Sequence, residues 1–219
     1  MDQQKAIELM QQRKFEEAAQ LFNDHIEAHP KDPVGYVNFG NLLMHTGDYD
    51  RAVVFYERAI ELDVKTGTAY YGIGNVLFEQ EKYKEAQFYY QNALKHGLDV
   101  SDVHFMLGLS LQNQDEHTLA LPYLLRAVEL EPDEEKEFQY GLALAHEELL
   151  DEAQKVFDQV LERNKEHSDA HYNLGVIALY HQDTEKSMYH FEEALKYQPD
   201  HVLAANGKKQ LQSFIDGEE

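Results

Sequence analysis

Two pairs of histidines have a spacing that could support metal binding. His25 and His29 lie four residues apart, and His167 and His171 repeat this interval. Residues at this spacing share one face of a helix, where two imidazoles can bind one metal ion. Neither pair has an evident third ligand, the HEXXH zinc motif is absent, and the second pair straddles an expected repeat boundary. We therefore interpret these histidines as structural or surface residues and predict no bound metal or other cofactor.

Carboxylates are frequent, but none stands in a setting that favours acid–base catalysis. The chain has 41 Asp and Glu residues, so pairs such as Glu192 and Glu193 arise by chance at many positions. An apolar setting raises the pKa of a carboxyl group, and no acidic residue is isolated among apolar ones in this way. The nucleophile-elbow motif, the phosphate-binding GxxxxGK motif and cysteine are all absent. The sequence therefore predicts no enzyme, and a metal-dependent enzyme stays open only as a third alternative.

Composition and charge narrow the classes of partner. The 219 residues include 19 Lys and Arg against 41 Asp and Glu, a formal charge of −22, and the longest basic cluster is the pair Lys208-Lys209. A phosphate backbone would meet mostly like charge, so nucleic-acid binding is disfavoured. No apolar stretch approaches the ~20 residues of a membrane-spanning helix, and the N-terminal residues do not resemble a signal peptide. Together with the absence of cysteine, this favours a cytoplasmic protein that binds neither nucleic acid nor membrane.

A repeat of 33 or 34 residues sets the positions of the remaining candidate residues. Glycines recur at Gly40, Gly74, Gly108, Gly141 and Gly175. Small residues follow, twelve positions later wherever a glycine is present, at Ala18, Ala52, Ala86, Ala120, Ala153 and Ser187. A bulky residue comes four positions after each small one, at Phe22, Tyr56, Tyr90, Leu124, Phe157 and Phe191. Series that stay in register over six units indicate a repeat architecture.

Each unit is predicted to fold as an antiparallel pair of helices. The small and bulky residues form an apolar stripe on the second helix, and residues such as Tyr36, Phe39 and Gly40 form another on the first. Polar links such as Thr46-Gly47-Asp48 are too short to do anything but reverse the chain. We expect each glycine to face the small residue of the second helix, so that the two backbones approach closely.

The quoted units resemble the tetratricopeptide repeat family. Segments such as VNFGNLLMHTGDYDRAVVFYERAIELD carry the resemblance, which covers nearly the whole chain. It implies an all-α fold, an α–α superhelix built as one solenoid over residues 1–216. We place the units at 1–32, 33–66, 67–100, 101–133, 134–167 and 168–201, with a closing helix at 202–216 whose apolar residues cover the last hairpin.

Two positions depart from this pattern. Pro122 lies within the expected second helix of the fourth unit, and we place it in the first turn of that helix, where a missing N–H costs least. The fifth unit has Glu147-Glu148 where a glycine turn is expected.

The resemblance further implies that the first helices line a concave groove where partners bind. The positions three before the glycine, one after it and one turn further on are expected to face this groove. The candidate partner-binding residues at these positions are Val37, Tyr71, Phe105, Phe138, Tyr172, Asn41, Asn75, Leu109, Leu142, Val176 and Phe78. The acidic residues Glu79, Asp102, Glu135 and Asp169 lie beside them. The alternative is that these side chains only pack neighbouring units together.

These residues predict a scaffold or adaptor for other proteins or peptides. An apolar groove with an acidic rim favours partners with apolar anchors and basic flanks. One subgroup of the family grips the C-terminal carboxylates of chaperones with lysines and an arginine, which this groove lacks, so such a tail is not expected to bind. A peptide-sensing regulator is the alternative function.

Overall fold

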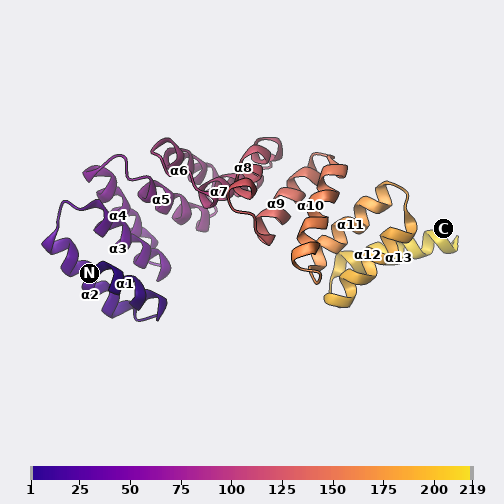
Figure 1. Cartoon of the computed structure of the whole chain (residues 1–219), viewed down its shortest axis with the longest axis horizontal. Helices are drawn as coiled ribbons and strands as arrows, with labels where there is room; N and C mark the ends of the chain where they lie inside the picture. The colour runs from indigo at the N-terminus through magenta and orange to yellow at the C-terminus, as the bar shows by residue number, and fades with distance from the viewer. Residues whose placement is uncertain (1, 218–219) are drawn as a thin grey trace. The chain divides into compact units, whose positions relative to one another are not determined.

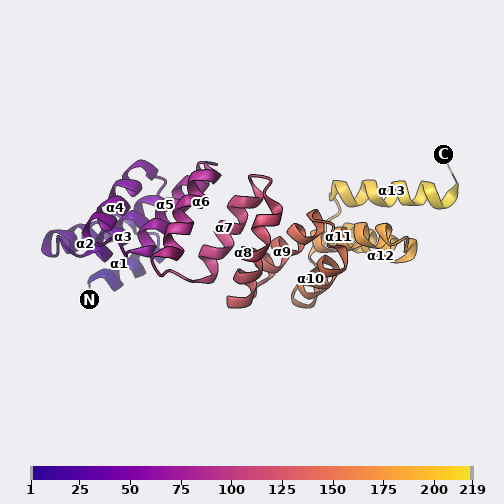
Figure 2. The same ribbon diagram turned by 90° about the horizontal axis from the view of Figure 1, so that it is seen from above.

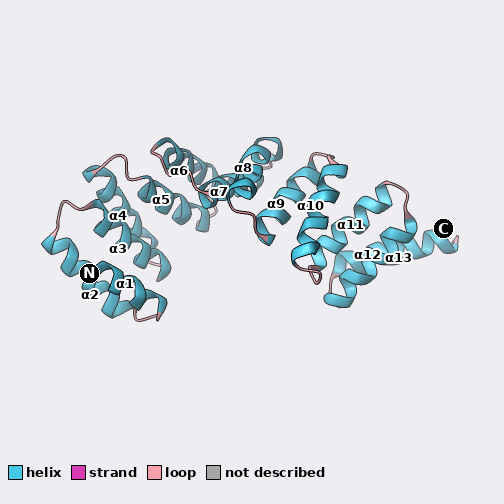
Figure 3. Cartoon of the chain, in the orientation of Figure 1, coloured by secondary structure: helices cyan, strands magenta, loops and turns pink. Residues whose placement is uncertain are grey.

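The computed structural model describes residues 2–217, which form thirteen helices and no strand. The helices follow one another in pairs, and we call the first helix of each pair the A helix and the second the B helix (Figures 1 and 3). The chain divides into two compact units, residues 1–123 and 124–219. The A helices are α1 (Asp2–Gln11), α3 (Pro33–His45), α5 (Gly67–Glu79), α7 (Ser101–Gln112), α9 (Glu134–His146), α11 (Ser168–Tyr180) and α13 (Val202–Asp216). The B helices are α2 (Phe15–Ala28), α4 (Tyr49–Leu62), α6 (Tyr83–Lys95), α8 (His117–Leu130), α10 (Leu150–Arg163) and α12 (Thr184–Tyr197). The expected all-α fold of helical hairpins is confirmed.

The turn inside each hairpin contains one residue in the left-handed backbone conformation. Glycine provides it at Gly47, with φ of 80°, but the other described hairpins use Arg13, Glu81, Asp115, Glu148 and Gln182, with φ between 59° and 62°. The glycine turn expected in the fifth unit is therefore replaced by Glu148. An L-residue in this conformation costs about 1–2 kcal/mol, which the packing of the two helices offsets.

The glycines of the A helices make room for an aromatic ring of the B helix. A Cβ atom on Gly40 would stand 2.7 Å from the Tyr56 ring, and one on Gly175 would stand 2.7 Å from the Phe191 ring. The bulky residue one helical turn after the small one thus fills the space beside these glycines, which the sequence expectation did not include. The small residues are buried as well. Ser187, the one that is polar, donates a hydrogen bond of 2.8 Å to the carbonyl of Gly175.

Pro122 lies inside α8, five residues after His117, and not in its first turn as the sequence suggested. Proline has no N–H, so α8 lacks one backbone hydrogen bond in its interior. The division between the two compact units falls one residue later, between Tyr123 and Leu124.

The last helix, α13, packs as an A helix without a B helix of its own (Figure 2). Ala204 and Leu211 join the core around Phe191, and Gly207 lies against the same ring. The other apolar residues expected to cover the last hairpin are exposed: Val202, Leu203, Phe214 and Ile215. They point away because α13 keeps the register of an A helix, whose inner face is set by Gly207 and Leu211.

Candidate protein-interaction surface

The aromatic residues three positions before each glycine lie half-buried on the A helices. Each ring packs on the bulky residue of its own B helix: Tyr71 on Tyr90 with ring centroids 5.8 Å apart, and Phe138 on Phe157 at 5.7 Å. Tyr172 packs in the same way on Phe191 at 6.0 Å, and Phe105 is also half-buried. Val37 differs, because it is only 6% exposed and belongs to the core around Tyr56. Val37 therefore offers a partner almost no surface, whereas the other four side chains are partly exposed.

In the second compact unit a histidine also packs against each of these rings. Phe138 lies 4.5 Å from His167, and Tyr172 lies 5.2 Å from His201, centroid to centroid. Both histidines precede an A helix, and each accepts a backbone N–H at Nδ1 over 3.2 Å, from Ala170 and Ala204 respectively. This assigns the proton of the neutral imidazole to Nε2. The rings therefore contribute to packing between neighbouring hairpins as well as to the surface.

Asn41 and Asn75 are tied to the tyrosines of the B helices. The Tyr56 hydroxyl donates to Oδ1 of Asn41 over 2.7 Å, and the Tyr90 hydroxyl donates to Oδ1 of Asn75 over 2.9 Å. Burial raises the pKa of both hydroxyls, so they remain protonated donors. Each asparagine thus accepts a hydrogen bond at Oδ1 inside the protein, which leaves its Nδ2 as a donor.

The A helix α11 presents an exposed apolar surface. On α11, Val176, Leu179 and Tyr180 are 41%, 43% and 68% exposed, at positions that share a face with Tyr172. Leu142 on α9 is half-buried, as are Leu109 on α7 and Phe78 on α5 in the first unit. Tyr180 was not among the residues singled out from the sequence, although its place five residues after Gly175 could have indicated it.

The predicted acidic residues all lie at the surface. Glu79, Asp102, Glu135 and Asp169 are exposed. Glu135 accepts a hydrogen bond of 2.9 Å from Gln139, and Asp169 Oδ1 lies 3.1 Å from Nε2 of His201. Asp169 thus also holds the histidine that caps α13.

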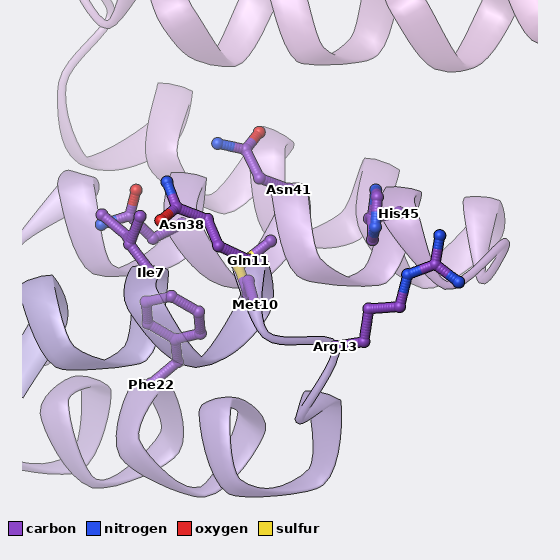
Figure 4. A pocket seen from close by; sticks show the side chains of 8 residues that line it. All are labelled: Ile7, Met10, Gln11, Arg13, Phe22, Asn38, Asn41 and His45. Carbon is purple, nitrogen blue, oxygen red and sulfur yellow. The ribbon is translucent and has the colours of Figure 1, made fainter.

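A pocket of about 440 Å³ lies between α1 and α3 (Figure 4). Its lining residues are Ile7, Met10, Gln11, Arg13, Phe22, Asn38, Asn41 and His45. Arg13 and His45 lie together at one end, and Ile7, Phe22 and Asn38 lie at the other. Of the predicted site residues, only Asn41 lines this pocket. The sequence did not reveal it, because the first unit has Ala6 in the glycine position and Arg13 belongs to a turn.

The histidine pairs take part in local packing and hydrogen bonding. His25 and His29 lie side by side with centroids 4.8 Å apart, and His25 Nε2 lies 2.8 Å from Oδ2 of Asp32 and in contact with Gln3. Burial alone would raise the pKa of Asp32, but hydrogen bonds from His25 and from the Val34 N–H lower it below its ordinary value. His171 pairs with His190, not with His167, at 3.1 Å between the Nδ1 atoms. Within residues 2–217, no group of three or more His, Asp or Glu residues could hold a metal ion.

Comparison with known families agrees with the hairpin geometry. Models of the tetratricopeptide repeat match residues 34–97, 71–135, 105–149 and 142–202. The chain belongs to the tetratricopeptide repeat family. Tetratricopeptide repeat (TPR) proteins are scaffolds for protein–protein or protein–peptide interaction, so the same role applies here in general terms.

Solved TPR structures resemble this chain closely. The crystal structure of YrrB, described as a TPR protein with an unusual peptide-binding site, is 44% identical with a TM-score of 0.83. The match covers 87% of this chain and 99% of YrrB. PilF of Pseudomonas aeruginosa has a TM-score of 0.80 at 16% identity, covering 97% of this chain and 95% of PilF, and so shares the fold. A search of curated protein sequences found no match.

The described part of the chain contains no candidate for a membrane-spanning helix. None of the helices between residues 2 and 217 has both the length and the apolar character to cross a bilayer.

Proposed function

We propose that this TPR protein is a scaffold or adaptor that binds segments of other proteins on the surface of its A helices. The bound segments carry apolar side chains flanked by lysine or arginine. The proposal includes a cytoplasmic location, which we expect from the cysteine-free composition. It includes no catalytic activity.

The observation that carries the proposal is the exposed apolar surface of α11. Val176, Leu179 and Tyr180 are each at least 41% exposed on one face of this helix. Large apolar side chains grouped on one surface are typical of interaction sites. Asp169 lies in the first turn of α11 itself and Glu135 in the first turn of the preceding A helix α9, so the acidic charge favours a basic partner.

The likeness to YrrB supports a peptide as the ligand. YrrB is described as having a peptide-binding site, and it is 44% identical over most of this chain. By analogy, we expect the segment bound here to be a short stretch of a partner rather than a whole folded surface.

The proposal is tested by selecting random twelve-residue peptides on the full chain and on two matched variants. Val176→Asp places a charge on the α11 surface, whereas Val54→Asp makes the same change at a site 60% exposed on the B helix α4. We expect the parent and Val54→Asp to enrich peptides with apolar residues beside lysine or arginine, and Val176→Asp to lose them. Equal enrichment by both variants would place binding elsewhere.

A further inference from the structure

The pocket between α1 and α3 has an apolar floor and a polar edge. Ile7, Met10 and Phe22 supply the apolar atoms, and the amides of Asn38 and Asn41 project above them from α3 (Figure 4). An aliphatic side chain seated on this floor would leave water and contact the half-buried Ile7 and Met10, with the fully buried Phe22 ring behind them.

Internal hydrogen bonds set which amide groups face the pocket. Asn38 Nδ2 donates to Oε1 of Gln3 over 2.9 Å, which leaves its Oδ1 as an acceptor. Asn41 uses Oδ1 to accept from Tyr56, which leaves its Nδ2 as a donor. The two residues are three positions apart on one face of α3, so they present one acceptor and one donor side by side. This is the complement of the N–H and C=O groups of an extended peptide.

Arg13 gives one end of the pocket a positive charge, and basic residues are fewer than acidic ones in this chain. Its guanidinium lies beside the His45 imidazole, which can donate a second hydrogen bond. Both side chains are exposed at the edge, and neither lies on the floor. In a chain of 41 acidic and 19 basic residues, this end of the pocket favours a carboxylate rather than the basic groups proposed for the rest of the surface.

We propose that this pocket binds an extended peptide segment in which an aliphatic residue is followed, two positions later, by aspartate or glutamate. In an extended chain, residues two apart point to the same side, about 7 Å from each other. The aliphatic side chain would then occupy the floor while the carboxylate meets Arg13 and His45. The inference rests on the proposed peptide-binding function and adds a subsite of opposite charge preference to it.

The test uses an array of acetylated, amidated nonapeptides with leucine at position four and glutamate, glutamine or lysine at position six. Arg13→Gln removes the charge and suits the turn, because Gln182 has φ of 62° in the equivalent turn. Arg58→Gln is the matched control, because it removes an exposed arginine from the B helix α4 of the same compact unit. We expect the parent and Arg58→Gln to retain glutamate peptides about tenfold more than glutamine peptides, and Arg13→Gln to retain both equally.

Three results would overturn the subsite. They are equal retention of the glutamate and glutamine peptides by the parent, a preference that survives in Arg13→Gln, and stronger binding of peptides that end in leucine with a free carboxylate. The last result would assign the pocket to C-terminal recognition. Failure of the subsite leaves the Val176→Asp selection unaffected, because that selection probes α11 in the other compact unit.

Discussion

The hydroxyl of Tyr56 donates a hydrogen bond of 2.7 Å to Oδ1 of Asn41 and so joins the B helix α4 to the exposed face of the A helix α3. Tyr90 and Asn75 repeat this pair one unit later. Where the B helix has phenylalanine, at Phe157 and Phe191, the A helix has Leu142 and Val176 instead. The side chain offered to a partner at this position therefore depends on whether the ring behind it carries a hydroxyl.

This dependence predicts a stability cost for changing one residue of the pair alone. Asn41→Leu removes the oxygen that accepts from the buried Tyr56 hydroxyl, leaves the Met44 sulfur 4.0 Å away as a weak acceptor, and should cost about 1–3 kcal/mol of unfolding free energy. The double variant Asn41→Leu, Tyr56→Phe copies Leu142 and Phe157 and should recover most of that loss. Urea denaturation of the two variants decides the matter. If the double variant is no more stable than Asn41→Leu, the hydrogen bond is not the cause.

Removing a glycine from one turn and introducing a glycine into another should have opposite effects on stability. Gly47→Ala forces a Cβ into a turn with φ of 80° and should destabilise the chain by about 1 kcal/mol. Glu148→Gly relieves the same strain at φ of 60° and should stabilise it by about 0.5 kcal/mol, because the added freedom of the unfolded chain offsets part of the gain. Thermal denaturation measures both. Effects of the same sign would show that backbone strain does not govern these turns.

The repeat was easier to predict from the sequence than the candidate interaction surface. The glycine and small-residue series located the hairpins, because packing inside a hairpin depends on residues at fixed intervals. His167 and His201 cap their A helices through contacts with residues three positions later, and they stand 34 residues apart, so the repeat interval could have indicated them. The place of Arg13 at a pocket depends on the packing of α1 against α3, which no interval encodes. Val37 was assigned to the surface because its interval matches Tyr71, yet the core around Tyr56 takes it in.

The buried pair His171 and His190 predicts that the chain loses stability in mild acid. The Lys165 carbonyl accepts from His171 Nε2 over 3.1 Å, so the His171 Nδ1 accepts from His190 when both rings are neutral. Burial, followed by repulsion from His171, lowers the pKa of His190 to about 4, and burial lowers the pKa of His171 as well. Nearby Glu193 opposes these shifts without reversing them.

The sign follows from the unfolded state, in which a histidine titrates near its ordinary pKa of about 6.5. Below that pH the unfolded chain binds protons that the native chain excludes, so the stabilisation is complete above about pH 6.5 and is lost as the pH falls toward 4. The slope for each histidine is at most about 1.4 kcal/mol per pH unit. Denaturation at pH 7.5, 6 and 5 should show the decline. The variant His171→Tyr, His190→Phe, which copies the contact of Tyr36 with Phe55, should remove most of it.

Phe138→Ala is expected to weaken both folding and binding. The ring packs on Phe157 and His167, so its loss should cost about 2 kcal/mol of unfolding free energy, in addition to any loss of partner affinity. Leu179→Ala is the matched comparison, because this side chain is 43% exposed and should change binding with little effect on folding. Urea denaturation and calorimetry with a selected peptide separate the two. A Phe138→Ala protein as stable as the parent would contradict the packing role.

Charge reversal at Glu135 and at Asp169 should affect the protein in different ways. Glu135 is exposed, and its carboxylate accepts a hydrogen bond from the neighbouring Gln139 side chain, so Glu135→Lys should slow the association of a basic peptide and reduce its dependence on salt, with the fold unchanged. Asp169 also faces the Nε2 proton of His201, whose Nδ1 caps α13, so Asp169→Lys should slow association and also loosen the start of α13. Stopped-flow binding at 50 and 300 mM salt measures the first effect, because rim charges act mainly on encounter. Hydrogen exchange over residues 202–211 measures the second, and equal protection there in both variants would show that Asp169 does not support the cap.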